Sequence, residues 1–278
     1  HWHIREMSIS PHCSYSQDDQ KDNDIIILHP ESAKLLQPED VDFLKGKNVL
    51  TDGETIHILQ EKGYDFGVET REITPDDAMI LLEEFRKDKL YPGIESYKVS
   101  FYAAGRSVAY AMNPLDKDAE IIADYHAQQS LTPYFENSEK PHGASELVIE
   151  TDKGGKWAIL GYCPWKSIIS SYIRDHILDL ADYVSGNGVP ARLITPVQAV
   201  LLPRKNNDGK VVCVSISNCV IGETGEMELL VRNPAGESFF FMSQYNGECE
   251  LTAEKRGDDY IVKVPSINGW SVGTVFVK

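Results

Sequence analysis

Several features that define other protein classes are missing from this sequence of 278 residues. No apolar run approaches the roughly 20 residues that a membrane helix needs, so we expect a soluble chain with no membrane partner. Basic residues are scarce, with 27 Lys and Arg against 43 Asp and Glu and a formal net charge of -16. Because nucleic-acid binding draws on clustered basic side chains, this charge disfavours a nucleic-acid partner.

Cysteine and histidine motifs are missing too. The five cysteines form no CxxC pair and are widely spread: Cys13, Cys163, Cys213, Cys219 and Cys249. This spacing argues against a zinc site or a dense disulfide framework and favours a reducing, cytoplasmic compartment, although a removed leader peptide would leave no trace. The histidines form no HExxH motif and no His-x-His pair outside His1 and His3, so we predict neither a metal site nor a cofactor.

Strand and helix signals alternate from residue 24 to residue 62. The short apolar runs DIIILHP and NVL each precede a helix-like segment, LQPEDVDFLKG and ETIHILQEKG. Two strand-helix units in succession favour an α/β fold with a parallel, doubly wound sheet.

The middle of the chain mixes signals. TPDDAMILLEEFRKDK has a helix start and apolar residues at helical spacing, which predicts a helix, a lid or an insertion. Strand candidates follow in YKVSFYAA, SVAYAMNP, AEIIADYHA and LTPYFE, and then a hairpin with a turn at Lys153-Gly154-Gly155. SIISSYIRDHILDLADYVSG is the clearest helix, with Gly186 as its C-cap and a role in packing on the sheet.

From Leu193 onward the pattern changes to short strands separated by Gly, Asn and Asp turns, which predicts a small β-sandwich. We place the boundary near Thr195-Pro196, giving an α/β domain over residues 1–195 and a sandwich domain over residues 196–278. The start at His1 resembles entry into a domain in mid-strand. We therefore expect a fragment of a longer polypeptide, with the α/β domain truncated at its N-terminus.

NVLTDGETIHILQEKG, from Asn48 to Gly63, predicts a strand, a sharp turn and a helix, where many hydrolases carry a nucleophile. Thr51, Asp52, Gly53 and Glu54 occupy this first elbow in place of Ser or Cys. Asp52 is a candidate carboxylate nucleophile. The alternative, a helix N-cap, is favoured because two acidic side chains repel an anionic substrate.

A second elbow candidate is Gly161-Tyr162-Cys163-Pro164-Trp165, between a strand and the strong helix. Cys163 is a candidate thiol nucleophile, with His176 or His126 as its base. Against this role, Pro164 has no backbone N–H for an oxyanion hole and Trp165 replaces the usual glycine. A buried structural Cys is the alternative that we favour.

Other candidates are less specific. Glycosidase chemistry needs two carboxylates flanking a sugar, and 43 acidic residues provide too many pairs for the sequence to select one. Trp157, Trp165 and Trp270 are candidates for stacking on a sugar, with Trp165 and Trp270 retained as possible binding residues, although core packing is the commoner role.

The order of three segments resembles the C-terminal region of bacterial glycoside hydrolases of the β-galactosidase kind: residues 25–63, KWAILGYCPW, and ARLITPVQAVLLPRKNNDGKVVCVSISN. The resemblance spans most of residues 24–278, and residues 73–112 depart from it. It implies a flavodoxin-like domain of the class I glutamine-amidotransferase type without its catalytic Cys, often used for oligomerisation, followed by a small β-sandwich. It also implies that the catalytic carboxylates lie on an upstream (β/α)₈ barrel.

The sequence thus predicts a non-catalytic module pair of a carbohydrate-active enzyme, which supports subunit assembly or shapes the rim of a neighbouring active site. Its expected partners are the upstream barrel of the same polypeptide and further copies of the chain, with carbohydrate contacted at most indirectly. Two alternatives remain open: an amidotransferase-like thiol hydrolase that uses Cys163, and a sugar-binding module that uses the aromatic residues of the sandwich.

Overall fold

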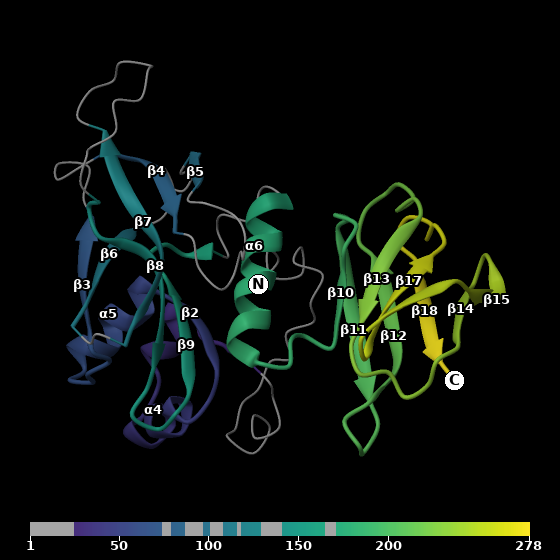
Figure 1. The fold of residues 1–278 in the computed structure, drawn as a ribbon, viewed down its shortest axis with the longest axis horizontal. Helices are drawn as coiled ribbons and strands as arrows, with labels where there is room; N and C mark the ends of the chain where they lie inside the picture. Colours follow the sequence, from purple (N-terminus) through teal and green to yellow (C-terminus); the bar gives the residue numbers. More distant parts are fainter. Residues whose placement is uncertain are drawn as a thin grey trace. The chain divides into compact units, whose positions relative to one another are not determined.

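The computed structural model describes residues 25–73, 79–86, 97–100, 108–115, 118–128, 141–164 and 171–278. Among them the chain forms two compact units, which Figure 1 shows as ribbons. The mixed-sheet unit contains the described residues up to 164 together with Asp179–Gly186, and the sandwich unit contains residues 171–178 and Asn187–Lys278.

The described part of the mixed-sheet unit is built from short helices and strands. In chain order they are β1 (Ile26–Ile27), α3 (Pro30–Ala33), α4 (Pro38–Lys45), β2 (Val49–Asp52), α5 (Gly53–Glu61), β3 (Val68–Ile73), β4 (Met79–Phe85), β5 (Tyr97–Ser100), β6 (Ala109–Pro114), β7 (Glu120–Gln128), β8 (Ala144–Glu150), β9 (Lys156–Leu160) and α6 (Ser171–Ser185), whose two halves fall in different units.

The predicted flavodoxin-like, doubly wound fold is wrong. The sheet has the order β1-β2-β9-β8-β7-β4-β5, and β6 pairs with both β8 and β3. The pair β1–β2 is parallel, as the two strand-helix units predict. The pair β2–β9 is also parallel, while every other pair that the structure describes in this sheet is antiparallel. After α5 the chain adds strands in hairpin-like pairings instead of helical crossovers, so a mixed sheet results.

The helix predicted in TPDDAMILLEEFRKDK is also wrong where the structure describes it, because Met79–Phe85 is strand β4. β4 lies between β5 and β7 and pairs with both. These ladders satisfy its backbone on both edges, which outweighs a helical spacing of apolar residues. The predicted helix start at Thr74-Pro75-Asp76 and the predicted strand LTPYFE lie outside the described residues.

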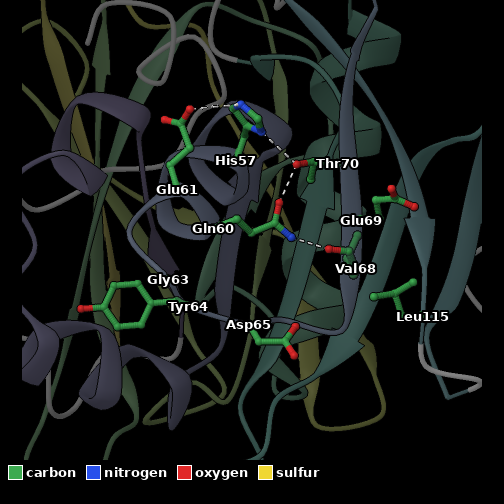
Figure 2. A pocket seen from close by; sticks show the side chains of 10 residues that line it. All are labelled: His57, Gln60, Glu61, Gly63, Tyr64, Asp65, Val68, Glu69, Thr70 and Leu115. Atoms are coloured by element: carbon green, nitrogen blue, oxygen red, sulfur yellow. Dashed lines mark hydrogen bonds and ion pairs between the residues drawn. The ribbon is translucent and has the colours of Figure 1, made fainter.

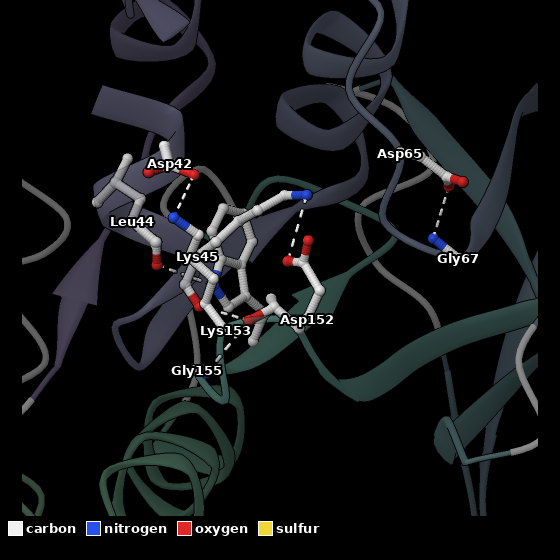
Figure 3. A network of polar contacts seen from close by, with 10 residues as sticks. Asp42, Leu44, Lys45, Asp65, Gly67, Asp152, Lys153 and Gly155 are labelled. Atoms are coloured by element: carbon white, nitrogen blue, oxygen red, sulfur yellow. Dashed lines mark hydrogen bonds and ion pairs between the residues drawn. The ribbon is translucent and has the colours of Figure 1, made fainter. Parts of the chain in front are cut away.

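The predicted hairpin at Lys153-Gly154-Gly155 is confirmed, with β8 and β9 antiparallel and Gly154 at φ +79. Its turn packs on the end of α4, as Figure 3 shows: Gly155 N donates to Lys45 O at 3.1 Å, Lys45 pairs with Asp152, and Lys153 pairs with Asp42. A Cβ atom on Gly155 would lie 2.3 Å from Lys47 O, so no other residue fits there.

One face of this sheet forms an apolar core with α4 and α5. It includes Trp157, which is fully buried and donates its indole N–H to Leu44 O at 3.3 Å. The Trp157 ring packs against that of Phe66, with the ring centroids 4.9 Å apart and the planes tilted by 39°. The predicted strong helix is confirmed as α6, with Gly186 in the left-handed conformation at φ +74 directly after its last residue.

Residues 187–278 form the two sheets of a β-sandwich. The first sheet has the order β10-β13-β17-β16 and the second β11-β12-β18-β14-β15. The strands are β10 (Ala191–Leu193), β11 (Ala199–Lys205), β12 (Val211–Asn218), β13 (Met227–Val231), β14 (Phe239–Ser243), β15 (Gly247–Leu251), β16 (Ala253–Arg256), β17 (Asp259–Val264) and β18 (Val272–Val277). Both sheets contribute to one apolar core that includes Leu229, Phe241 and Val262.

Candidate functional site

The first elbow, at Asp52 and Gly53, is buried and its acidic side chain is not exposed to solvent. Asp52 ends β2 with extended backbone and caps α5, its Oδ1 accepting the Thr55 N–H at 2.8 Å. The side chain is fully buried, and this burial raises the pKa of Asp52 from 3.8 to about 6, although hydrogen bonds from Thr55 oppose the shift. A Cβ on Gly53 would lie 2.7 Å from Tyr110 Cβ, so the turn is packed against Tyr110 too closely for a side chain at position 53. This is the N-cap arrangement that the acidic turn favours over a nucleophile.

The two elbows that the sequence suggests separately lie side by side. β2 and β9 are parallel neighbours in which Asp52 is opposite Leu160, and Cys163 follows shortly after β9. The Cys163 thiol lies close enough to Asp52 to lower the pKa of that carboxyl, without reversing the effect of burial. Cys163 is itself buried, with 3% of its surface exposed.

The two histidines considered as bases for Cys163 have other surroundings. His126 is buried on β7 and its Nε2 lies 2.8 Å from Glu84 Oε2. His176 is buried on α6, in the half of the helix that belongs to the sandwich unit. Trp165 lies outside the described residues.

Sequence reasoning missed a buried carboxyl pair, Glu83 on β4 and Glu146 on β8. Their side chains are 5% and 1% exposed, and the Tyr162 hydroxyl donates to Glu146 Oε1 at 3.1 Å. Burial, together with the nearby Glu146 carboxyl, raises the pKa of Glu83 well above its usual range. The raised pKa favours the protonated form of the Glu83 carboxyl. The available signal was the position of Glu146 directly before the apolar residues LVI in ASELVIE.

An open groove of about 740 Å³ lies between the end of α5 and β3, and Figure 2 shows its lining. Three acidic side chains reach it, from Glu61, Asp65 and Glu69. Further lining residues are His57, Gln60, Gly63, Tyr64, Val68, Thr70 and Leu115. Sequence reasoning missed this groove, because it forms only when Val68–Ile73 folds back beside α5.

A chain of hydrogen bonds forms the floor of the groove. Gln60 Nε2 donates to Val68 O, and Thr70 Oγ1 donates to Gln60 Oε1 at 2.6 Å. Thr70 Oγ1 also lies 3.2 Å from His57 Nδ1. Beyond this chain, His57 Nε2 lies 3.7 Å from Glu61 Oε1, which is too long for a hydrogen bond. These contacts connect His57, Gln60 and Thr70 along one side of the groove (Figure 2).

In the sandwich unit, Trp270 is exposed on a loop, with 73% of its surface accessible. Its φ of +55 is unusual for a bulky residue, and its backbone N–H donates to Val220 O at 3.1 Å. The buried Asn218 connects the loop between β12 and β13 to the loop between β17 and β18. Its Nδ2 donates to Gly222 O in the first loop and to Ile267 O and Asn268 O in the second. Trp157, by contrast, lies in the core and is unavailable to a sugar.

Two negative findings apply to the described residues alone. They contain no cluster of three or more His, Cys, Asp or Glu side chains arranged to hold a metal ion. Among these residues there is also no helix with the length and apolar character needed to cross a membrane.

The chain matches no protein family and no curated protein. Its fold is similar to that of α-L-fucosidase isoenzyme 2 from Paenibacillus thiaminolyticus, with a TM-score of 0.59 at 11% sequence identity. The match covers 92% of this chain and 41% of the fucosidase chain, so this chain spans less than half of that protein. The neighbour is a glycoside hydrolase, whereas the expected β-galactosidase kind is not confirmed.

Proposed function

We propose that this chain is a non-catalytic region of a carbohydrate-active enzyme, in which it supports assembly or shapes the rim of a catalytic domain carried elsewhere in the polypeptide. The observation that carries the proposal is the likeness of its fold, over 92% of its length, to less than half of an α-L-fucosidase. The buried first elbow supports it, because Asp52 is buried as a helix cap and is out of reach of a substrate.

The decisive experiment is an assay of the isolated chain on a panel of aryl glycosides, with esters and amides as a second panel. We expect no turnover above that of heat-denatured chain. Turnover abolished by Cys163→Ala or Asp52→Asn, in variants that keep the native circular dichroism spectrum, would overturn the proposal. Measuring the mass in solution by light scattering then tests the assembly role, for which a concentration-dependent dimer or larger species is expected.

The competing function, a thiol hydrolase acting through Cys163, makes an opposite prediction for alkylation. A nucleophilic thiol reacts quickly near neutral pH, whereas a buried structural thiol does not. Cys219 and Cys249 are exposed and serve as internal controls. We expect iodoacetamide to modify both of them before Cys163, as followed by peptide mass spectrometry. Preferential modification of Cys163 in the folded chain would favour the hydrolase instead.

A second candidate function, direct sugar binding by the sandwich unit, is favoured by Trp270. An exposed indole held in a strained backbone conformation is typical of a binding residue, since strain of this kind persists where the surrounding structure fixes it. Quenching of tryptophan fluorescence by oligosaccharides tests this function. The quenching should be saturable and absent in Trp270→Ala, and it should be unchanged in Tyr245→Ala, which removes an exposed aromatic residue from another loop.

A further inference from the structure

In the groove beside α5, hydrogen bonds among the lining residues determine which groups donate and which accept. The amide of Gln60 is oriented by Val68, because its Nε2 donates to the Val68 carbonyl. The other end of the amide, Oε1, is therefore an acceptor. It receives the proton of the Thr70 hydroxyl at 2.6 Å.

This arrangement fixes the tautomer of His57. A hydroxyl carries a single proton, and that of Thr70 is used on Gln60. The contact of 3.2 Å between Thr70 Oγ1 and His57 Nδ1 is then a hydrogen bond only if Nδ1 carries a proton. In the neutral imidazole Nε2 has no proton and presents a lone pair.

The groove consequently presents acceptors. His57 Nε2 lies 3.7 Å from Glu61 Oε1, and the Glu61 side chain is 71% exposed. The carboxylates of Asp65 and Glu69 line the same groove and, when ionised, also only accept. Three carboxylates repel an anionic ligand, so the groove fits a ligand rich in hydrogen-bond donors.

We propose that this groove binds a neutral sugar through two hydroxyls on adjacent ring carbons, one donating to His57 Nε2 and the other to Glu61. Such hydroxyls lie about 3 Å apart and each donates one proton, which matches two acceptors spaced by 3.7 Å. The volume of about 740 Å³ admits a pyranose ring beside Tyr64 and Leu115. The choice of a sugar rests on the proposed function, whereas the acceptor geometry is independent of it.

The first test examines the tautomer without any ligand. Long-range ¹H–¹⁵N correlation spectra of the histidine side chains, recorded at pH 8, identify which ring nitrogen carries the proton. We expect His57 to be protonated at Nδ1, and we expect Thr70→Val to remove this preference while the rest of the spectrum stays native. A His57 protonated at Nε2 in the unmodified chain would overturn the proposal.

The second test titrates the chain with methyl pyranosides that carry adjacent free hydroxyls, and with matched deoxy sugars that lack one of them. Saturable amide shifts are expected in residues 57–70 for the first group only. Loss of the charge-assisted hydrogen bond in Glu61→Gln should weaken binding about tenfold. Glu250→Gln, an exposed carboxylate on β15, should leave it unchanged.

Equal binding of the deoxy sugars, no saturable shift, or binding of lysine amide in place of the diols would each overturn the sugar assignment. These outcomes leave the proposed function standing, because that function fails on turnover by the chain and not on sugar binding. Turnover, conversely, would leave the tautomer and titration results unaffected.

Discussion

The two units of this chain differ in the side chains that form their interiors. The described part of the mixed-sheet unit buries nine polar or charged side chains: Thr51, Asp52, Thr55, Glu83, Asp124, His126, Ser145, Glu146 and Ser185. In the described part of the sandwich unit, Arg174 and His176 are buried on α6, whereas Asn218 is the one buried polar side chain within residues 187–278. The core between the two sheets is apolar.

This difference predicts how the stability of each unit depends on pH and on packing. Apolar burial is nearly independent of pH and is sensitive to packing, whereas buried carboxyls make stability depend on protonation. In the mixed-sheet unit, the pKa of Asp52 and that of Glu83 are both raised by burial. The sandwich should therefore respond to changes of volume, and the mixed-sheet unit to changes of pH.

The largest effect is expected from a cavity in the sandwich. Phe241 is fully buried, and a Cβ on Gly273 would lie 2.4 Å from its ring, so the ring has tight surroundings. Phe241→Ala should lower the free energy of unfolding of the sandwich by about 3–5 kcal/mol. Hydrogen exchange followed by mass spectrometry measures this loss in residues 199–277. A loss below about 1 kcal/mol would contradict tight packing.

The next effect is on pH dependence. The pKa of Asp52 is about 6 in the folded state and 3.8 ordinarily. Below pH 3.8 the carboxyl is protonated in both the folded and the unfolded state, so Asp52 does not lower the free energy of unfolding there. As pH rises toward 6 the unfolded state releases its proton first, and stability falls by about 3 kcal/mol. Glu83 extends this loss to higher pH.

Denaturation with urea at pH 4 and pH 7, read by hydrogen exchange in α5, checks this prediction. Asp52→Asn keeps a capping side chain and should remove the Asp52 part of the pH dependence. Asp208→Asn, in an exposed turn of the sandwich, is the matched control. Stability of the mixed-sheet unit that rises between pH 4 and pH 7 would contradict the sign derived above.

A smaller loss is expected at the single buried polar side chain of residues 187–278. Asn218→Ala removes hydrogen bonds to three loop carbonyls and leaves them without this donor. The free energy of unfolding should fall by about 1–3 kcal/mol. Faster hydrogen exchange should appear in residues 219–225 and 266–271. If Asn218→Ala changes only the global stability, Asn218 does not hold these two loops.

The smallest effect is a gain. Trp270 has a positive φ that glycine adopts without strain, so Trp270→Gly should raise the stability of the sandwich by up to about 1 kcal/mol. Thermal denaturation measures it, with Tyr245→Gly as a control at an exposed aromatic residue. A loss of stability in Trp270→Gly would show that the indole contributes packing contacts to the folded sandwich, which would contradict a role in ligand binding alone.

Local patterns were predictable where one short segment determines its own structure. The first two strand-helix units, the turn at Gly154 and the helix ending at Gly186 follow from apolar periodicity and glycine positions. β4 was not predictable, because its pairing with β5 and β7 depends on segments distant in sequence. The buried pair Glu83 and Glu146 and the groove at His57 have the same origin, since each joins residues from separate elements.

The glycine turn between β11 and β12 has a practical consequence. Gly209 has φ +75 and no atom within 4 Å of a hypothetical Cβ, in contrast to Gly155, whose turn touches the end of α4. A peptide tag or a fluorescent label inserted at residues 207–209 would therefore project into solvent and leave the neighbouring ladder intact. The same insertion at residues 153–155 would separate β8 and β9 from α4, so the sandwich turn is the place to attach a reporter for the binding experiments.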